Sequence, residues 1–446
     1  MGLNETPTSE RVQIGLFGRV NAGKSSLLNA LAGQEIAVVD DQEGTTTDPV
    51  RKAMELLPIG PVMLYDTPGL LDETALGEKR QQKTEEVLRR IDVGLIVVDA
   101  MDTASDWGVE KRLLSSINRS NLPFLIIANK AEGLSRPQRD DFQRRLAEQW
   151  GVPVETVVPF SCKEPLSDRG ATELRERIAA FGRNSVKKRR YLVSDLLQKG
   201  DVLVLVVPID ESAPKGRLIL PQQQVIRDAL DHGIITMTLQ PSELLQGLDK
   251  LSAPPSLVVT DSQAFGEVDR LLPQTIPLTS FSILMARYKG DLDWQAKGAK
   301  TIDHLKPGAR ILISEGCTHH RQCGDIGTVK LPNWIESYAR QRMKEEDASD
   351  GNAADARTGQ ERNPEGLLFE YHFTSGGEFP VDVSDFDLII HCGGCTLPER
   401  EMAWRLSVAK EASVPMTNYG TMIAHLHGIL ERAMRGFGRE ENECAG

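Results

Sequence analysis

The segment GRVNAGKS (residues 18–25) has the spacing G-x-x-x-x-G-K-S of a nucleotide phosphate-binding loop. The β-rich run QIGLF precedes it and the run SSLLNALAG follows it, which is the strand–loop–helix setting that such a loop requires. Amides of the glycine-rich turn can face a β-phosphate, Lys24 supplies a positive charge, and Ser25 supplies a hydroxyl ligand for Mg²⁺. The residues expected to contact the phosphates are Gly18, Asn21, Ala22, Gly23, Lys24, Ser25 and Ser26.

Two further segments carry the groups that a magnesium–phosphate complex needs. DTPG (residues 66–69) ends the run VMLYD, so we expect the Asp66 carboxylate to hold Mg²⁺ through water and the Gly69 N–H to contact the γ-phosphate. GTTTD (residues 44–48) lies between the two motifs, and one of its threonine hydroxyls is expected to complete the magnesium shell. Thr46 is our first choice for that ligand, and Thr45 is the alternative.

Another pair of motifs matches the positions with which small GTPases read guanine, usually written NKxD and SAK. NKAE (residues 129–132) follows the run FLIIA, and SCK (residues 161–163) follows VVPF. Glu132 stands where Asp is usual; its longer arm keeps two acceptor oxygens for the guanine edge, so we expect guanine preference to survive. Cys162 replaces the usual Ala, and we expect its thiol to act as a small buried hydrophobe. The residues expected to contact the base are Asn129, Lys130, Glu132, Ser161, Cys162 and Lys163.

Two residues bear on how water would be activated. Leu70 follows DTPG where Ras-like enzymes carry a water-orienting Gln, so that route is absent. Asn21 gives the loop the pattern GxxNxGKS, which resembles the TrmE–Era–EngA group of GTPases. In some members of that group such an Asn helps to bind a potassium ion that substitutes for an arginine finger; the alternative is that Asn21 only caps the loop. The residues expected to support hydrolysis are Lys24, Asn21, Thr46, Asp66 and Gly69.

Cysteine and histidine gather in two motifs near the other end of the chain. CTHH (residues 317–320) follows the run ARILISEG, and HCGGC (residues 391–395) follows DLII. Because ligand sites of parallel sheets lie at the carboxyl ends of strands, we expect the two motifs to converge. Cys317, Cys392 and Cys395 make three ligands of a 4Fe–4S cluster, or of a structural zinc site of the Cys₃His type. The candidates for a fourth ligand are His319, His391, Cys323 and Asp325.

The elements that must position these motifs alternate between strand-like and helical runs, which predicts α/β domains with mainly parallel sheets. Residues 1–183 form the expected P-loop GTPase domain, of Ras-like fold. Residues 184–280 contain no catalytic constellation and are expected to form a dimerisation domain. Within it, the basic run 184–191 is expected to be a linker, and Pro221 and Gly233 are expected to mark the limits of a helix. Residues 281–446 are expected to form the metal-binding domain, with a disordered acidic insert at 344–365 and helices over 397–412 and 418–435.

Composition narrows the class of protein. The 446 residues carry a net charge of −12, which disfavours nucleic acid as a partner because a nucleic-acid-binding surface is usually basic. No apolar run approaches a membrane span, and the first residues contain no apolar core of a signal peptide. Six cysteines are too few for a disulfide scaffold. We therefore expect a cytoplasmic protein with no membrane partner.

A GTPase domain of this kind followed by CxH…HCxxC resembles the FeFe-hydrogenase maturation GTPases, the HydF family. The resemblance implies GTP, Mg²⁺ and a 4Fe–4S cluster on Cys317, Cys392 and Cys395, with His319 and His391 nearby. It also implies a homodimer or higher oligomer that assembles and carries a diiron subcluster precursor. The partners implied are two radical-SAM maturases and the apo FeFe-hydrogenase. The alternative is a GTPase of ribosome assembly or tRNA modification with a structural zinc domain.

Overall fold

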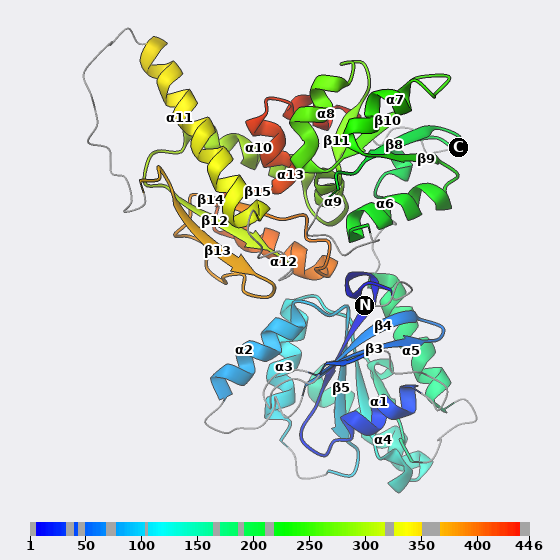
Figure 1. Cartoon of the computed structure of the whole chain (residues 1–446). Coiled ribbons are helices and arrows are strands. Elements are labelled where there is room, and N and C mark those ends of the chain that lie inside the picture. Colours follow the sequence, from blue (N-terminus) through cyan, green and yellow to red (C-terminus); the bar gives the residue numbers. More distant parts are fainter. Residues whose placement is uncertain are drawn as a thin grey trace. The chain divides into compact units, whose positions relative to one another are not determined.

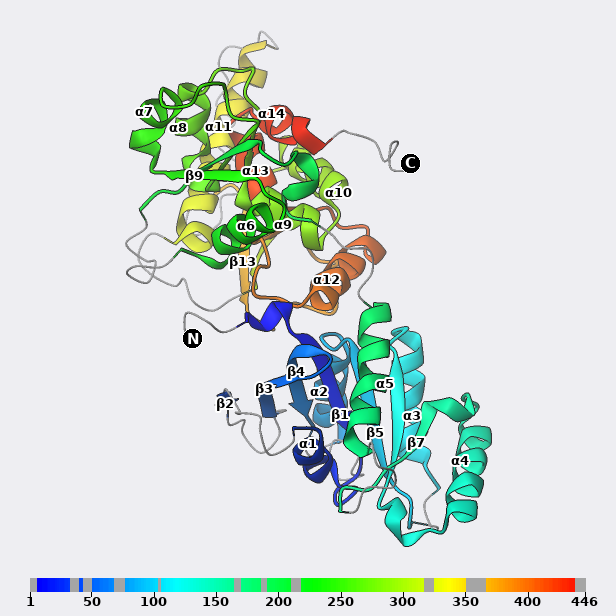
Figure 2. The ribbon, with the colours of Figure 1, turned by 90° about the vertical axis from the view of Figure 1, so that its right-hand side faces the viewer.

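The structure, a computed structural model, describes residues 6–32, 40–42, 50–67, 77–102, 106–163, 170–185, 191–209, 218–316, 325–349 and 366–437. The chain divides into two compact units, each with its own sheets and covering helices (Figures 1 and 2). The first unit contains Met1–Arg189 with Pro398–Glu401, and the second contains Arg190–Leu397 with Met402–Gly446. Within the described residues, no helix is both long and apolar enough to cross a membrane.

One seven-stranded sheet organises the first unit, in the order β2-β3-β4-β1-β5-β6-β7. The pairs from β4 through β7 are parallel, whereas β2–β3 and β3–β4 are antiparallel. The Ras-like α/β class expected for this part of the chain is confirmed. The antiparallel edge was not predicted, because its polar sequence lacks a strong β-rich run. The strands are β1 (Val12–Phe17), β2 (Asp40–Gln42), β3 (Val50–Leu56), β4 (Gly60–Asp66), β5 (Val93–Asp99), β6 (Phe124–Asn129) and β7 (Val157–Pro159).

Helices cover both faces of this sheet (Figures 1 and 2). Alternation along β1 explains why: Ile14 and Leu16 enter one buried cluster, with side chains of α1 and α5, while Phe17 enters another, with side chains of α2, α3 and α4. Because the strands from β4 to β7 are parallel, their carboxyl ends and the starts of the following helices lie at the same edge of the sheet. The helices are α1 (Lys24–Ala32), α2 (Gly77–Leu88), α3 (Gly108–Arg119), α4 (Arg136–Trp150) and α5 (Gly170–Ser185).

Two four-stranded parallel sheets form the second unit, in the orders β11-β10-β8-β9 and β13-β12-β14-β15. Both confirm the expected parallel class. Side chains from both sheets, including Val204, Val258, Ile311 and Ile390, meet in one buried cluster. The strands are β8 (Val202–Val206), β9 (Ile235–Leu239), β10 (Leu257–Thr260), β11 (Leu278–Ser280), β12 (Arg310–Glu315), β13 (Glu370–Ser375), β14 (Leu388–His391) and β15 (Met416–Asn418).

The helices follow the sequence signals with three differences, two in the second unit and one at the end of α5 in the first. The stretch 418–435, expected as one helix, is split because Gly428 adopts a positive φ of 71° after α13. Residues 344–349 of the expected acidic insert complete α11, since Lys and Glu are good helix formers, and residues 350–365 lie outside the described residues. Residues 184–185 of the expected linker belong to α5, and residues 186–190 are not described. The helices are α6 (Leu220–Asp231), α7 (Leu244–Leu248), α8 (Phe265–Leu271), α9 (Phe281–Lys289), α10 (Leu292–Ala299), α11 (Leu331–Ser349), α12 (Glu399–Glu411), α13 (Tyr419–Leu426) and α14 (Leu430–Met434).

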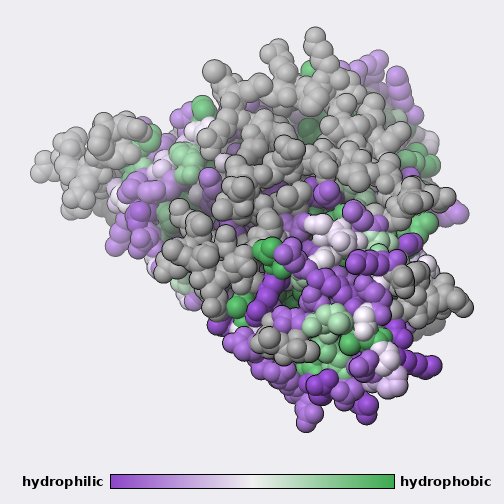
Figure 3. Space-filling view, turned by 90° about the horizontal axis from the view of Figure 1, so that it is seen from below, coloured by the Kyte–Doolittle hydropathy of each residue, from purple (hydrophilic) through white to green (hydrophobic). Residues whose placement is uncertain are grey.

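The surface agrees with the high content of charged residues. Seen from below, the described side chains are mostly hydrophilic, with smaller apolar patches among them (Figure 3). This pattern is ordinary for a folded chain in which 26% of residues are charged.

The Asp228 carboxylate on α6 gives a test of the second unit's stability. Its Oδ2 accepts the backbone N–H groups of Leu192 (3.1 Å), Val193 (2.9 Å) and Ser194 (2.9 Å). Asp228→Ala leaves these donors without their acceptor, so we expect the free energy of unfolding in urea to fall by about 2–3 kcal/mol. Asp231→Ala, which removes an exposed carboxylate from the same helix, should change it by less than about 0.5 kcal/mol. Equal effects of the two substitutions would contradict this assignment.

Candidate nucleotide and metal sites

The phosphate loop lies between β1 and α1, as the sequence predicted. Lys24 folds back over the loop, where its Nζ donates to the carbonyl oxygens of Gly18 (2.9 Å) and Arg19 (3.0 Å). Asn21 adopts a left-handed φ of 65°, a conformation that Asn tolerates better than most residues. Gly23 must lack a side chain, because a Cβ there would overlap the Asn129 amide. The loop is thus closed around a buried lysine.

The Asp66 carboxylate, at the end of β4, lies close to this lysine. Its Oδ1 is buried and has no hydrogen-bond partner in the described part of the chain. Burial raises the pKa of Asp66, while Lys24, Lys52 and a hydrogen bond with Ser25 oppose that rise. A buried acceptor beside a serine hydroxyl fits a magnesium site. Thr46, Thr45, Gly69 and Leu70 lie outside the described residues.

Of the residues predicted to bind guanine, Asn129 is hydrogen-bonded to the phosphate loop, whereas one carboxylate oxygen of Glu132 has no described partner. Asn129 donates from Nδ2 to the carbonyl of Ala22 (2.9 Å) and accepts from the Cys162 thiol (3.2 Å). Burial raises the pKa of that thiol to about 11, so Cys162 stays protonated as a donor. Glu132 Oε2 is buried and has no hydrogen-bond partner among the described residues. A buried acceptor of this kind fits a residue that accepts hydrogen bonds from guanine.

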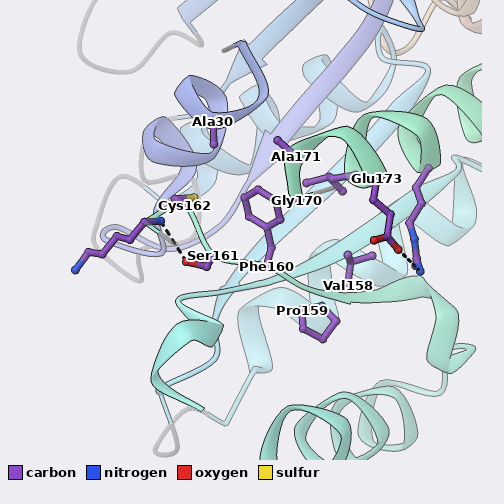
Figure 4. A pocket seen from close by; sticks show the side chains of 12 residues that line it. Ala30, Val158, Pro159, Phe160, Ser161, Cys162, Gly170, Ala171 and Glu173 are labelled. Carbon is purple, nitrogen blue, oxygen red and sulfur yellow. Dashed lines mark hydrogen bonds and ion pairs between the residues drawn. The ribbon is translucent and has the colours of Figure 1, made fainter. Parts of the chain in front are cut away.

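A cavity of about 600 Å³ collects these motifs. It brings together residues from the phosphate loop, β4, NKAE and SCK, whereas Gly18, Ala22 and Ser161 do not line it. A neighbouring pocket of about 240 Å³ lies behind SCK, where α1, β7 and α5 meet (Figure 4), and it shares Cys162 and Lys163 with the first. The larger cavity is lined by Val20, Asn21, Gly23, Lys24, Ser25, Ser26, Asp66, Asn129, Lys130, Glu132, Cys162 and Lys163.

Two ion pairs that support this site were not predicted. Lys130 pairs with Asp99 at the end of β5 (Nζ to Oδ2, 2.6 Å). Arg19 in the phosphate loop donates from Nε (2.6 Å) and Nη2 (3.1 Å) to Glu110, which is 1% exposed on α3. Both acids come from segments far from their partners in sequence. The position of Asp99 directly after a buried strand, like that of Asp66, was the only sequence signal for either.

Glu132 allows a direct test of base recognition. Glu132→Gln replaces one acceptor oxygen by an amide donor, so we expect GDP affinity to fall about tenfold to a hundredfold. Xanthosine diphosphate, which presents a carbonyl in place of the guanine amino group, should gain relative to GDP. Fluorescent-nucleotide titration measures both, and Glu173→Gln, on the neighbouring pocket, is the matched control. An unchanged GDP affinity in Glu132→Gln would contradict the assignment.

The second candidate site lies at the carboxyl edge of the sheet that contains β12 and β14. These strands pair in parallel with Ser314 opposite His391, so the chain leaves the sheet side by side before Cys317 and at Cys392. The Gly316 N–H donates to Cys392 Sγ (3.0 Å). Cys317, His319 and Cys323 lie outside the described residues. Within the part of the chain that the structure describes, no group of three or more His, Cys, Asp or Glu side chains could hold a metal ion. Of the three predicted cysteine ligands, the structure therefore describes Cys392 and Cys395.

The turn between the two thiols is tight. Gly394 has a left-handed φ of 61°, and its N–H also faces Cys392 Sγ (3.4 Å). Burial raises the pKa of Cys395, and the nearby Lys289 opposes that rise. Thiols that receive amide hydrogen bonds beside a buried cation fit a site for thiolate ligands.

The two described candidates for a fourth ligand already have partners. His391 is fully buried; its Nδ1 contacts the carbonyl of Cys392 (2.7 Å) and its Nε2 contacts Arg405 (2.9 Å). Burial, assisted by Arg405, lowers the pKa of His391 to about 3, so the ring is neutral and Nε2 accepts from the guanidinium. Asp325 Oδ2 accepts from the Thr328 N–H and hydroxyl (both 3.0 Å). A metal at His391 Nε2 would have to displace Arg405.

Comparison with known relatives divides the chain as the sites do. Residues 13–130 match the model of the 50S ribosome-binding GTPase. Among curated relatives, the tRNA modification GTPase MnmE of Laribacter hongkongensis is 40% identical over 126 residues, which cover 28% of this chain and 27% of that protein. GTPase Der of Maridesulfovibrio salexigens is 34% identical over 201 residues, which cover 41% and 43%. The chain thus spans less than half the length of these curated relatives.

A solved structure, Era of Aquifex aeolicus bound to GDP and AlF₄⁻, is 19% identical and covers 58% of this chain and 97% of its own, with a TM-score of 0.30. The remainder of the chain matches two other models. Residues 192–290 match the hydrogen maturase F dimerization domain, and residues 293–361 and 359–436 match the hydrogen maturase F tetramerization domain. Because both of these models follow a matching GTPase domain, the chain belongs to the hydrogen maturase F family.

Proposed function

We propose that this GTPase is a scaffold that carries a 4Fe–4S cluster, assembles the diiron subcluster precursor on it and delivers that precursor to apo FeFe-hydrogenase. Two radical-SAM maturases act as the other partners. The observation that carries the proposal is the parallel pairing of β12 with β14, which starts both cysteine motifs from adjacent strand ends. Membership of the hydrogen maturase F family supports the same function.

The nucleotide half is proposed to bind and hydrolyse GTP. Lys24 and the loop amides hold the phosphates, Ser25 and Thr46 ligate Mg²⁺, and Asp66 orients it through water. Glu132 accepts from the guanine edge. These groups thereby position the nucleotide and exclude adenine. Hydrolysis of GTP then controls how the scaffold associates with its partner proteins.

The cluster half is proposed to use Cys317, Cys392 and Cys395. Three thiolates leave one iron of a bound cluster with an exchangeable ligand, to which a precursor group can bind and from which it can leave. Within the chain, the Gly316 and Gly394 amides hold Cys392 Sγ, and Arg405 holds the His391 ring. Because Arg405 occupies the Nε2 atom of His391, we propose that His391 supports the cluster site without binding iron. His319 stays a candidate for the fourth ligand.

The proposed domains keep the boundaries expected from the sequence. We propose a GTPase domain at 1–183, a dimerisation domain at 184–280 and a cluster domain at 281–446, working in the cytoplasm. The matched dimerization and tetramerization models support self-association. The alternative, a ribosome-assembly or tRNA-modification GTPase with a structural zinc domain, is supported only by the GTPase model over residues 13–130 and by curated relatives that cover less than half of this chain, so we do not favour it.

Potassium dependence tests the role of Asn21. We expect GTP hydrolysis to be at least about tenfold faster in potassium chloride than in sodium chloride at equal ionic strength, since a bound K⁺ would stabilise the charge of the transition state. Asn21→Gly tolerates the φ of 65° but removes the side chain, so it should lose the potassium stimulation and keep the slow basal rate. Equal rates of the unaltered protein in the two salts would refute the potassium role.

Cysteine variants test the cluster. After anaerobic reconstitution with iron and sulfide, Cys317→Ser, Cys392→Ser and Cys395→Ser should each lose most of the bound iron and the brown colour, because each removes a thiolate ligand. GTP hydrolysis should persist in all three. Cys444→Ser, in the polar tail, is the control and should retain the iron. If Cys323→Ser loses the cluster as completely as Cys392→Ser, the site has four cysteine ligands and the open-iron proposal is wrong.

A further inference from the structure

A lysine from outside the cysteine motifs holds the turn between the two described thiols. Lys289, the last residue of α9, is 4% exposed. Its Nζ donates to the carbonyl oxygens of Gly394 (3.0 Å), Cys395 (2.9 Å) and Leu397 (2.8 Å). Three carbonyl acceptors around one nitrogen require three N–H donors, which only the charged ammonium form has. The turn therefore closes around a buried positive charge.

The rest of α9 packs against the same edge of the sheet. A Cβ added at Gly393 would make ordinary van der Waals contacts with Met285 and Ser282, so the turn passes close to α9. In the first turn of α9, Ser282 accepts from the Asn418 amide at the end of β15 (to its carbonyl, 2.7 Å) and from the Gly420 N–H (to its hydroxyl, 3.2 Å). The helix thus fixes the edge at both of its ends.

This helix lies in the segment that matches the dimerization domain, whereas the turn lies in the segment that matches the tetramerization domain. Hydrogen bonds from a charged donor are stronger than neutral ones, and the buried setting weakens competition from water. Three of them on one short turn hold it in shape without a metal. A fixed positive charge beside thiolates also favours the addition of an electron to any centre bound there.

We propose that Lys289 is a positioning residue for the cluster: it preorganises the turn 392–397 for metal binding, and its charge raises the reduction potential of the cluster that those thiolates hold. The second part rests on the proposed function. The first part concerns the protein before iron is added and is measured separately.

The experiment compares the full-length protein with Lys289→Met, Lys289→Arg and Lys297→Met. Lys289→Met keeps the length of the side chain but removes charge and donors; Lys289→Arg keeps the charge; Lys297→Met removes an exposed lysine from the neighbouring α10. Circular dichroism identifies any variant that fails to fold. Hydrogen exchange of residues 392–397 is measured before reconstitution. Iron content, the EPR spectrum of the reduced cluster and its reduction potential are measured afterwards.

We expect exchange of residues 392–397 to be about tenfold faster in Lys289→Met, since at least one charged hydrogen bond is lost. The reduction potential should become more negative and the EPR line shape should change, while Lys289→Arg restores part of the potential and Lys297→Met matches the unaltered protein. Unchanged exchange, potential and line shape in a folded, iron-loaded Lys289→Met would overturn the inference and leave the proposed function standing. If the unaltered protein binds no iron–sulfur cluster, the proposed function and the claim on the potential both fail.

Discussion

Parallel pairing of strands is the constraint on which both candidate sites depend. In a parallel sheet every strand ends at the same edge, so residues far apart in sequence meet there without a dedicated scaffold. In the first unit this places Asp66, Asp99 and Asn129, the last residues of β4, β5 and β6, at one edge of the sheet. In the second it sets Ser314 against His391, so that Gly316 reaches Cys392 Sγ. In each unit, the register of the parallel strands brings the residues of the candidate site together.

A second physical feature is the use of buried cations to shape loops that bear no regular structure. Lys24 closes the phosphate loop through two carbonyls, and Lys289 closes the cysteine turn through three. Arg405, fully buried, contacts His391 and the Ser314 hydroxyl (3.4 Å) at neighbouring strand ends. Burying such charges is unfavourable unless hydrogen bonds compensate, so each fixes the backbone around it. A preformed loop can then bind an anionic phosphate or a thiolate-bound metal with little rearrangement.

Much of this arrangement was predictable from the sequence. The β-rich runs became strands, and Pro221 and Gly233 correctly marked the limits of α6 (Leu220–Asp231) to within two residues. The motifs identified the nucleotide cavity because each of the four places its contacts within one short segment of the chain. The partners Glu110, Lys289 and Arg405 escaped prediction because they act across long sequence separations, where no local spacing exists. The short strands β2 and β15 escaped because pairing with a neighbour, and not their own sequence, makes them extended.

The central claim is a cluster held by three cysteines with one exchangeable iron. The most direct measurement is EPR of the reduced, reconstituted full-length protein with and without ¹³C-labelled cyanide, alongside iron and zinc analysis. We expect four irons per cluster, little zinc, and ¹³C hyperfine coupling that appears when cyanide binds the open iron. A zinc-loaded, EPR-silent protein, or a cluster whose spectrum is unchanged by cyanide, would contradict it.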